Sequence, residues 1–171
     1  MNPRVVAVKL FLSELGLNEN ASDDQLQCAI YLSQARGVDL GYRFGFYRSN
    51  DEKGAERTPA SPELERDLSE LREIWLHDRT KFDRVSLHGN VSRALSGVKK
   101  LLDACPPKTA VGKWIKLLAV LEYQVHVRKE KKPRLGNSKT VLFRKAMTTL
   151  HLSARPSRRL SSPNQPAAHL S

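Results

Sequence analysis

The first part of the chain carries apolar residues at helical spacing in two blocks. Asn2-Pro3 opens the first block and Gly16 ends it, and proline suits a first helical position because no intrahelical N–H is needed there. Ser22 opens the second block with Gln25 three residues later, which is a capping-box pattern. We expect helices here with inward residues at Val5, Val8, Leu12 and Leu15, and at Leu26, Ala29, Ile30 and Ser33.

After Gly37, which is a helix stop signal, the helical period gives way to alternation. Tyr42, Phe44 and Phe46 take every second position, and they alternate with Arg43, Gly45 and Tyr47. This two-residue repeat is typical of a strand with one buried face. Residues 48–60 are polar and allow either a hairpin or a long loop, and Thr58-Pro59 argues against a central strand.

The remainder of the chain repeats the helical period. Ser61-Pro62-Glu63 opens a third helix, Asn90 is the expected cap of a fourth, and Thr109 is the expected cap of a fifth. A sixth helix is expected over residues 139–152. The inward residues are Leu64, Leu68, Leu71 and Trp75, then Val91, Leu95, Val98 and Leu102, then Val111, Trp114, Ile115, Leu118, Leu121 and Val125, and finally Val141, Leu142 and Ala146.

These elements predict a mainly α fold, α+β at most, with five or six helices and a small β hairpin or extended strip near residues 38–60. The fifth helix has the broadest apolar face and is expected at the centre of the core. We expect one helical domain over residues 1–127, a basic linker over 128–138, the additional helix over 139–152, and a disordered tail over 153–171, where proline and serine replace large apolar residues.

Charge changes the picture more than composition does. The chain has 171 residues and a net charge of +11. Residues 1–78 hold nine Lys/Arg against fourteen Asp/Glu, and residues 79–171 hold twenty against four. The basic second half suggests an acidic partner or nucleic acid, although a solvated basic surface that keeps the protein soluble explains it equally.

Nothing in the sequence predicts a membrane span or a secreted chain. No apolar run approaches the roughly 20 residues of a membrane helix, and Glu14 with the polar residues 18–25 interrupts any secretory pattern. Cys28 and Cys105 lie in apolar helical contexts and are interpreted as buried thiols of a reducing cytoplasm in preference to a disulfide.

No catalytic, metal or cofactor motif is present. The five histidines are scattered, and HExxH, CxxC and phosphate-loop patterns are absent from the sequence. Ser61 is explained by capping, and His126 by a hydrogen-bonded position beside the fifth helix. We therefore predict no enzyme activity and no cofactor, although catalysis by dispersed residues stays an alternative.

Nucleic-acid binding is the second functional hypothesis. Between Arg128 and Arg159 there are eleven Lys/Arg against one acid, which predicts attraction to phosphates without sequence reading. A helix-turn-helix reading of the first two helices is disfavoured because the second begins with acids. The candidate contacts are Arg128, Lys129, Lys131, Lys132, Arg134, Lys139, Arg144 and Lys145.

The stretch 26–68 resembles the SocA-like (Panacea, YwgA-like) domain family. The resemblance rests on Leu26-Gln27-Cys28-Ala29-Ile30-Tyr31-Leu32, on the segment 40–47 (LGYRFGFY), and on Ser61-Pro62-Glu63-Leu64 with Asp67-Leu68, and it extends over about residues 5–125. The chain departs from the family pattern at Cys28, where a lysine is common, and at Thr58-Pro59-Ala60, where Gly-Pro-Tyr is expected.

The resemblance implies a small helical domain without enzyme activity. Members are antitoxins or adaptors of bacteria and their mobile genetic elements, which act in the cytoplasm and hold a protein partner such as a toxin. Aromatic anchors are also common at interfaces, so Tyr42, Phe44 and Phe46 either fill the core, the favoured reading for Phe44, or contact a partner. Arg43 and Tyr47 lie at the alternate positions, on the other face of the predicted strand. They are the predicted partner-binding residues, together with Arg48 and the 50–60 loop.

Overall fold

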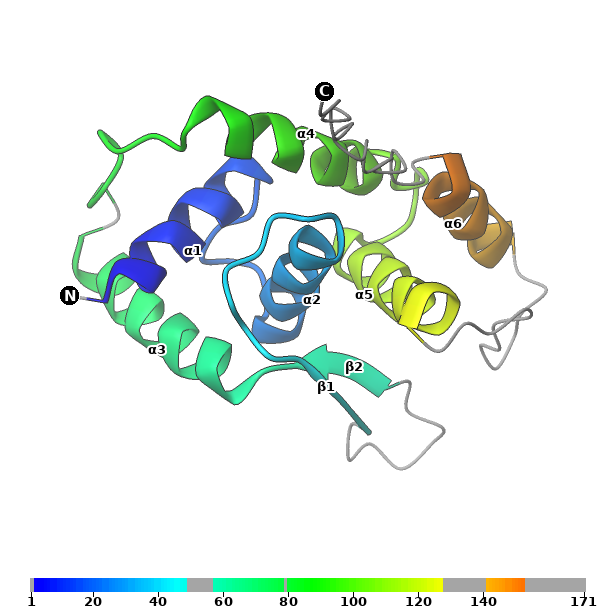
Figure 1. The fold of residues 1–171 in the computed structure, drawn as a ribbon, viewed down its shortest axis with the longest axis horizontal. Coiled ribbons are helices and arrows are strands. Elements are labelled where there is room, and N and C mark those ends of the chain that lie inside the picture. The colour runs from blue at the N-terminus through cyan, green and yellow to red at the C-terminus, as the bar shows by residue number, and fades with distance from the viewer. Residues whose placement is uncertain (1, 49–56, 79, 128–140, 153–171) are drawn as a thin grey trace, which may run out of the picture.

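The computed structural model describes residues 2–48, 57–78, 80–127 and 141–152. These residues form six α-helices, one π-helical turn and a two-stranded antiparallel sheet, which confirms the predicted fold class (Figure 1). The elements in order are α1 (Pro3–Glu14), α2 (Asp23–Ala35), β1 (Gly45–Arg48), β2 (Arg57–Ala60), α3 (Pro62–His77), α4 (Gly89–Asp103), α5 (Val111–Glu122), the π turn (Tyr123–Val127) and α6 (Val141–Leu152).

The centre of the fold is α2, with α5 packed beside it. Figure 1 shows α2 in the middle, surrounded by α1, α3, α4, α5 and the hairpin, and α2 contacts each of these neighbours. Every residue from Leu26 to Ser33 is buried, so the helix has no solvent face over two turns. The prediction of α5 at the centre is confirmed in part, because α5 shares the core with α2 while α6 covers its other side.

Three predicted helix starts are confirmed in atomic detail. The Asn2 side chain accepts from the Arg4 amide, and the Ser61 hydroxyl accepts from the Leu64 amide. Ser22 and Gln25 form the reciprocal capping box, with each side chain bonded to the other residue's backbone N–H. These caps satisfy N–H groups that have no partner inside the helix.

Two other predicted starts are wrong by one residue or two. The N-cap of α4 is His88, whose ring Nδ1 accepts from the Asn90 amide, so Asn90 lies inside the helix. The N-cap of α5 is Ala110, without a side-chain cap, and Thr109 lies before it. A cap is set by local backbone geometry, which the residue type alone does not fix.

Two predicted inward residues face solvent. Val111 is 52% exposed and Val141 is 83% exposed. Each is the first residue of its helix, where none of the described helices covers the apolar stripe. The strand is also shorter than the alternation predicts, because only Gly45–Arg48 pairs with β2. The linker 128–138, Lys139 and the tail 153–171 lie outside the described residues.

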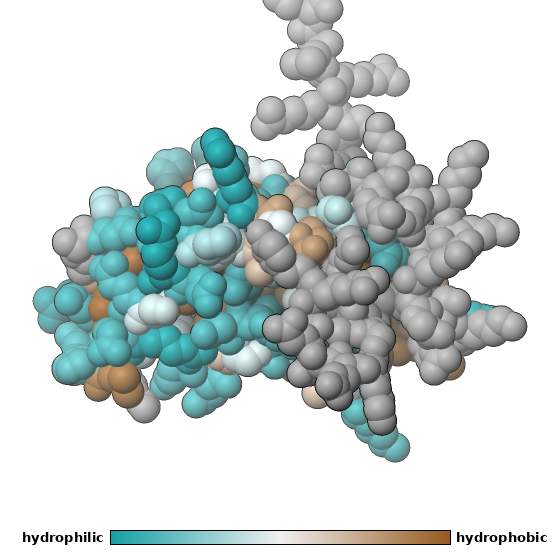
Figure 2. All heavy atoms as spheres, turned by 90° about the horizontal axis from the view of Figure 1, so that it is seen from below, coloured by the Kyte–Doolittle hydropathy of each residue, from teal (hydrophilic) through white to brown (hydrophobic). Residues whose placement is uncertain are grey.

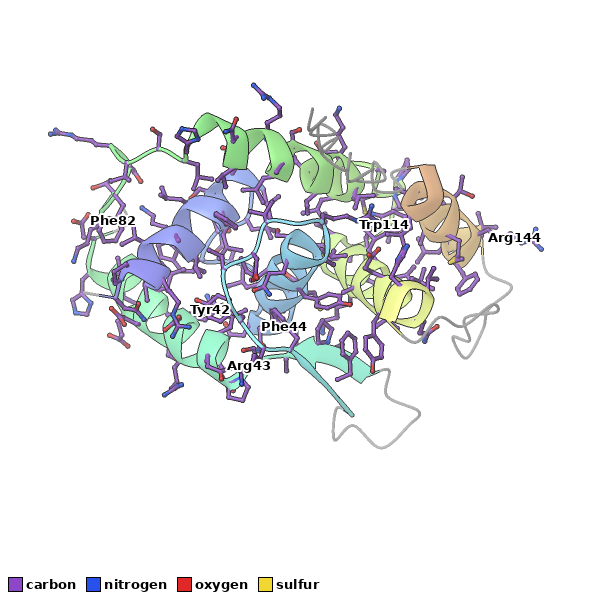
Figure 3. All side chains as sticks on the ribbon, in the orientation of Figure 1. Tyr42, Arg43, Phe44, Phe82, Trp114 and Arg144 are labelled. Atoms are coloured by element: carbon purple, nitrogen blue, oxygen red, sulfur yellow. The ribbon has the colours of Figure 1, made fainter. Side chains whose placement is uncertain are left out.

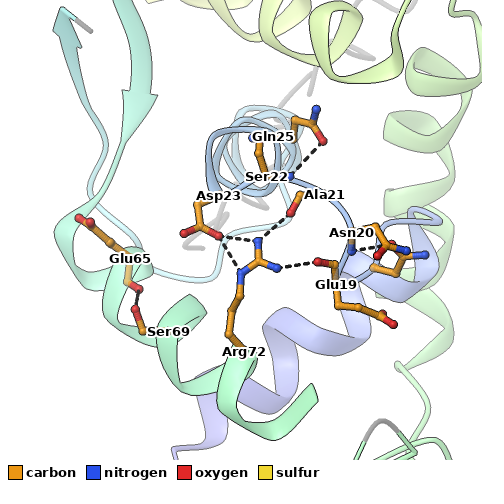
Figure 4. Close-up of polar contacts among 10 residues, drawn as sticks. Glu19, Asn20, Ala21, Ser22, Asp23, Gln25, Glu65, Ser69 and Arg72 are labelled. Carbon is orange, nitrogen blue, oxygen red and sulfur yellow. Dashed lines mark hydrogen bonds and ion pairs between the residues drawn. The ribbon is translucent and has the colours of Figure 1, made fainter. Parts of the chain in front are cut away.

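Arg72 of α3 ties the loop before α2 to the rest of the fold (Figure 4). Its guanidinium donates to the carbonyls of Glu19 and Ala21 at 2.6 and 2.7 Å, and to Asp23 Oδ1 at 2.6 and 3.0 Å. One fork-shaped side chain thus fixes two carbonyls of the loop and the first residue of α2, which a lysine ammonium cannot match.

Removing this contact should lower the stability of the fold. We expect Arg72→Ala to reduce the free energy of unfolding by about 1–2 kcal/mol, because backbone carbonyls lose a charged donor. The matched control is Arg66→Ala, an exposed arginine on the same helix, which should change stability by less than about 0.5 kcal/mol. Urea unfolding followed by circular dichroism measures both, and equal losses would contradict the assigned role of Arg72.

Candidate functional site

The aromatic strip, residues 42–47, is held to α2 by Gln34. The Gln34 amide donates to the Tyr42 carbonyl at 3.0 Å and accepts from the Tyr42 amide at 3.1 Å, as a neighbouring strand would. Gly37 and Gly41 have φ of +93° and +78°, a backbone region that favours glycine. These two turns bring the chain back alongside the helix it has just left.

The start of the strip is anchored on Asp67, a buried carboxylate of α3. The Tyr42 hydroxyl donates to Asp67 at 2.6 Å and the Asn2 side-chain amide donates at 2.9 Å. The Arg4 guanidinium lies 3.5 Å from Asp67 and 5.3 Å from the Tyr42 ring centroid. Burial, and then the hydrogen bond and charge of Asp67, raise the pKa of the Tyr42 phenol above its usual range. Asp67 therefore joins α1, the strip and α3.

The two phenylalanines of the strip pack inward, as the alternation predicts. The rings of Phe44 and Phe46 meet Tyr31 of α2 edge-on, with centroids 5.4 and 5.3 Å apart. Phe46 also stacks on Tyr123, at 3.5 Å between centroids. Both phenylalanines are half-buried, so the favoured reading of Phe44 as a core residue agrees with its packing.

Arg43 is exposed between two inward aromatic residues, as predicted. In Figure 3, Tyr42 lies between α1 and α3, whereas Arg43 lies at the outer edge near the start of α3. The pKa of Glu63 is lowered by the hydrogen bonds that its carboxylate accepts from its own backbone N–H and from the Ser61 hydroxyl, and less strongly by the charges of Arg66 and Arg43. Tyr47 and Arg48 lie in β1, and their side chains are outside the described structure.

The register of the hairpin determines which backbone groups of β1 face outward. Phe46 pairs with Pro59, and Gly45 and Tyr47 pair with Ala60 and Thr58. Proline has no N–H, so Phe46 and Pro59 occupy a non-hydrogen-bonded position, and the bonds to β2 run from Gly45 and Tyr47. The N–H and C=O of Phe46 and Arg48 consequently point away from β2, and no described strand pairs with β1 on that side.

The surface on the side of α3 and the hairpin is mainly hydrophilic. Figure 2 shows its apolar residues scattered in small groups over the part of this face that is coloured. Among the described residues the large exposed apolar side chains include Leu76, at 78%. None of the helices in the described ranges combines the length and apolar character that crossing a bilayer requires.

The candidate nucleic-acid residues are only partly described. Arg144 and Lys145 lie on the exposed side of α6, and Figure 3 shows Arg144 projecting away from the body of the molecule. The other six candidates lie outside the described residues: Arg128, Lys129, Lys131, Lys132, Arg134 and Lys139. Their role stays a prediction.

Both cysteines are free thiols, and Cys28 is buried as predicted, whereas Cys105 is only half-buried. Burial raises the pKa of Cys28 to about 12, and burial also raises that of Cys105. Such thiols carry little thiolate at neutral pH and are poor nucleophiles. Within the described ranges, no three metal-ligating side chains gather into a site.

Sequence reasoning did not assign three polar residues that position the strip. Gln27 is buried and accepts from the Ser61 amide at 2.8 Å, which fixes the start of α3 against α2. Gln34 and Asp67 hold Tyr42. The available signal was their placement, because each is polar and lies among apolar positions of a helix, where burial without a partner is costly.

No family model, curated protein or solved structure matches this chain. The SocA-like resemblance therefore stays a prediction.

Tyr42 should give the fold a pH dependence in the alkaline range. Its pKa is raised in the folded chain, so its stabilising contribution is complete below about pH 10 and is lost as the pH rises toward the folded pKa. We expect the free energy of unfolding of a Cys28→Ala variant to fall more steeply above about pH 10 than that of Cys28→Ala/Tyr42→Phe.

The Cys28→Ala background removes a thiol whose raised pKa would also lower the free energy of unfolding as the pH rises. Urea midpoints at a series of alkaline pH values measure the two slopes. Parallel slopes would show that Tyr42 ionises as freely in the folded chain as in the unfolded one.

Proposed function

We propose that this chain is a non-enzymatic protein-binding module, antitoxin-like or adaptor-like, which binds a partner protein through β1 and Arg43. The observation that carries the proposal is the outer edge of β1, where Phe46 and Arg48 direct backbone N–H and C=O groups away from β2. An unpaired edge binds an extended segment through main-chain hydrogen bonds, and adjacent side chains provide specificity.

The contacts that hold Tyr42 and Phe46 in place favour the binding of a partner segment at the edge of β1. Gln34 and Asp67 fix Tyr42, and Tyr31 and Tyr123 hold Phe46. A strand that is already ordered loses less conformational freedom on binding, which strengthens the complex. An exposed strand edge can also pair with unrelated chains. The short length of β1 limits such nonspecific pairing.

Arg43 supplies a charged contact next to this edge. Its exposed guanidinium is free to pair with a carboxylate of the partner, and such rim charges affect association rate and specificity. Tyr47 and Arg48 complete the proposed contact set. The SocA-like resemblance supports the same reading, because that family's partners are proteins such as toxins and its members act in the cytoplasm.

Charge reversal at Arg43 tests the proposal. The full chain, Arg43→Glu and the matched control Arg84→Glu serve as baits in host extract, and the retained proteins are quantified by mass spectrometry. Arg84 is also exposed but follows the far end of α3. A protein lost with Arg43→Glu and kept with Arg84→Glu is then purified and titrated calorimetrically, with an expected loss of at least about tenfold in affinity, or about 1.4 kcal/mol. Equal binding by all three baits would refute the assigned contact.

Hydrogen exchange tests the edge itself. In the free chain the amides of Phe46 and Arg48 should exchange faster than those of Gly45 and Tyr47, because only the latter pair donates to β2. Adding the partner should slow Phe46 and Arg48 selectively. Protection elsewhere with no change at these two amides would place the partner on another surface.

A further inference from the structure

Two of the three described carboxylates beyond residue 79 are neutralised by cations of the first half of the chain. Lys9 of α1 pairs with Asp83 at 2.9 Å, and Arg36 at the end of α2 pairs with Glu122 at 3.0 Å. Among described residues 80–127 and 141–152, the remaining carboxylate is Asp103. The second half therefore has few acids left to offset its own positive charges.

Those positive charges lie at the surface of α4, the α4–α5 turn and α6. We define the basic face as six exposed cations that have no ion pair among the described residues: Arg93, Lys99, Lys100, Lys108, Arg144 and Lys145. By contrast, Lys116 of α5 is paired with Asp24 at 2.7 Å. Other exposed described cations without an ion pair lie elsewhere: Lys113 on α5, Lys81 and Arg84 between α3 and α4, and Arg43 and Arg66 near the start of α3. The six cations on α4, the α4–α5 turn and α6 are the largest group.

The elements that carry the basic face are neighbours. Figure 1 shows α6 just beyond the C-terminal end of α4. Lys145 lies close enough to Cys105, two residues past the end of α4, to oppose the rise in the pKa of that thiol. On α4 itself, Arg93 and Lys100 are seven residues apart, which places them on one side of the helix with Gly97 between them. Ala94, Ser96 and Gly97 are small and exposed, so a bulky backbone can approach the helix closely.

We propose that the basic face binds the sugar–phosphate backbone of a nucleic-acid duplex, as a function separate from the partner binding at β1. Phosphate contacts by Lys and Arg supply affinity without reading sequence. Binding of single strands relies on exposed aromatic side chains that stack on bases. The large exposed apolar residues among those described are Leu76, Val85, Val111 and Val141, and none is aromatic. A duplex backbone fits this chemistry better than unpaired bases do.

The opposite side of the molecule orients the complex. In Figure 1, α3 and α4 lie on opposite sides of α1 and α2. The solvent side of α3 carries Glu65 and Glu73, both exposed, and these charges are repelled by phosphates. The hairpin, which leads directly into α3, stays clear of the duplex and accessible to a protein.

The salt dependence of binding tests the proposal. Anisotropy of a labelled DNA duplex is measured with the full chain between about 50 and 200 mM salt, where each phosphate contact adds about 0.9 to the slope of log K against log salt. We expect Arg93→Gln/Lys100→Gln to lower the slope by about 2, one contact for each residue. The matched control Arg43→Gln/Arg66→Gln removes two charges from the side of α3 and should leave the slope unchanged.

Three further ligands complete the experiment: an RNA duplex of equal length, single-stranded DNA, and vesicles containing phosphatidylserine. Comparable binding of both duplexes, with weaker binding of single strands and vesicles, is the expected result. Binding to one duplex alone identifies which backbone the face accepts. Equal slopes for the α4 variant and the wild type, an equal loss in the control variant, or tighter binding of vesicles than of either duplex would each overturn the proposal. Circular dichroism of both variants verifies that the fold is retained.

Discussion

The structure depends on the burial of α2 on every side. A helix without a solvent face must satisfy each of its polar side chains internally, because an unpaired buried polar group costs about 1–3 kcal/mol. Gln27 meets this requirement at the start of α3, and Ser33 bonds back to the Ala29 carbonyl. Gln34, at the edge of the buried stretch, binds both backbone groups of Tyr42. The hydrogen bonds that satisfy the polar side chains of α2 therefore fix the positions of the hairpin and of α3.

Charged contacts between the two halves of the chain then lock the outer elements in place. Lys9, which is buried, donates to Asp83 and to the Lys81 carbonyl in the turn between α3 and α4. Arg36 reaches the buried Glu122, and the His126 ring lies 3.1 Å from the same carboxylate. Since an unpaired buried charge is strongly destabilising, these contacts specify how the halves dock. They also leave the cations of α4 and α6 facing solvent.

The parts of the fold that sequence reasoning anticipates are those set by local chemistry. The capping box at Ser22, the start of α3 at Ser61 and the inward parity of Tyr42 and Phe46 follow from side chains close to one another in sequence. Contacts such as Asp67 with Asn2 join residues 65 positions apart, and no local pattern encodes that pairing. The same limit explains why Val111 and Val141 are exposed although the sequence predicts that they face inward. Helical periodicity defines an apolar stripe but not where the neighbouring helix ends.

The candidate site follows the same division. The exposure of Arg43 is a consequence of alternation, which the sequence contains. The open edge of β1 depends on a register that brings Pro59 opposite Phe46, and register is a tertiary property. A shift of one residue would place Pro59 opposite Gly45 or Tyr47 and reverse which groups of β1 face outward, while also turning Phe46 away from Tyr31. Aromatic packing on α2 thus selects the register, and the register determines which backbone groups are available to a partner.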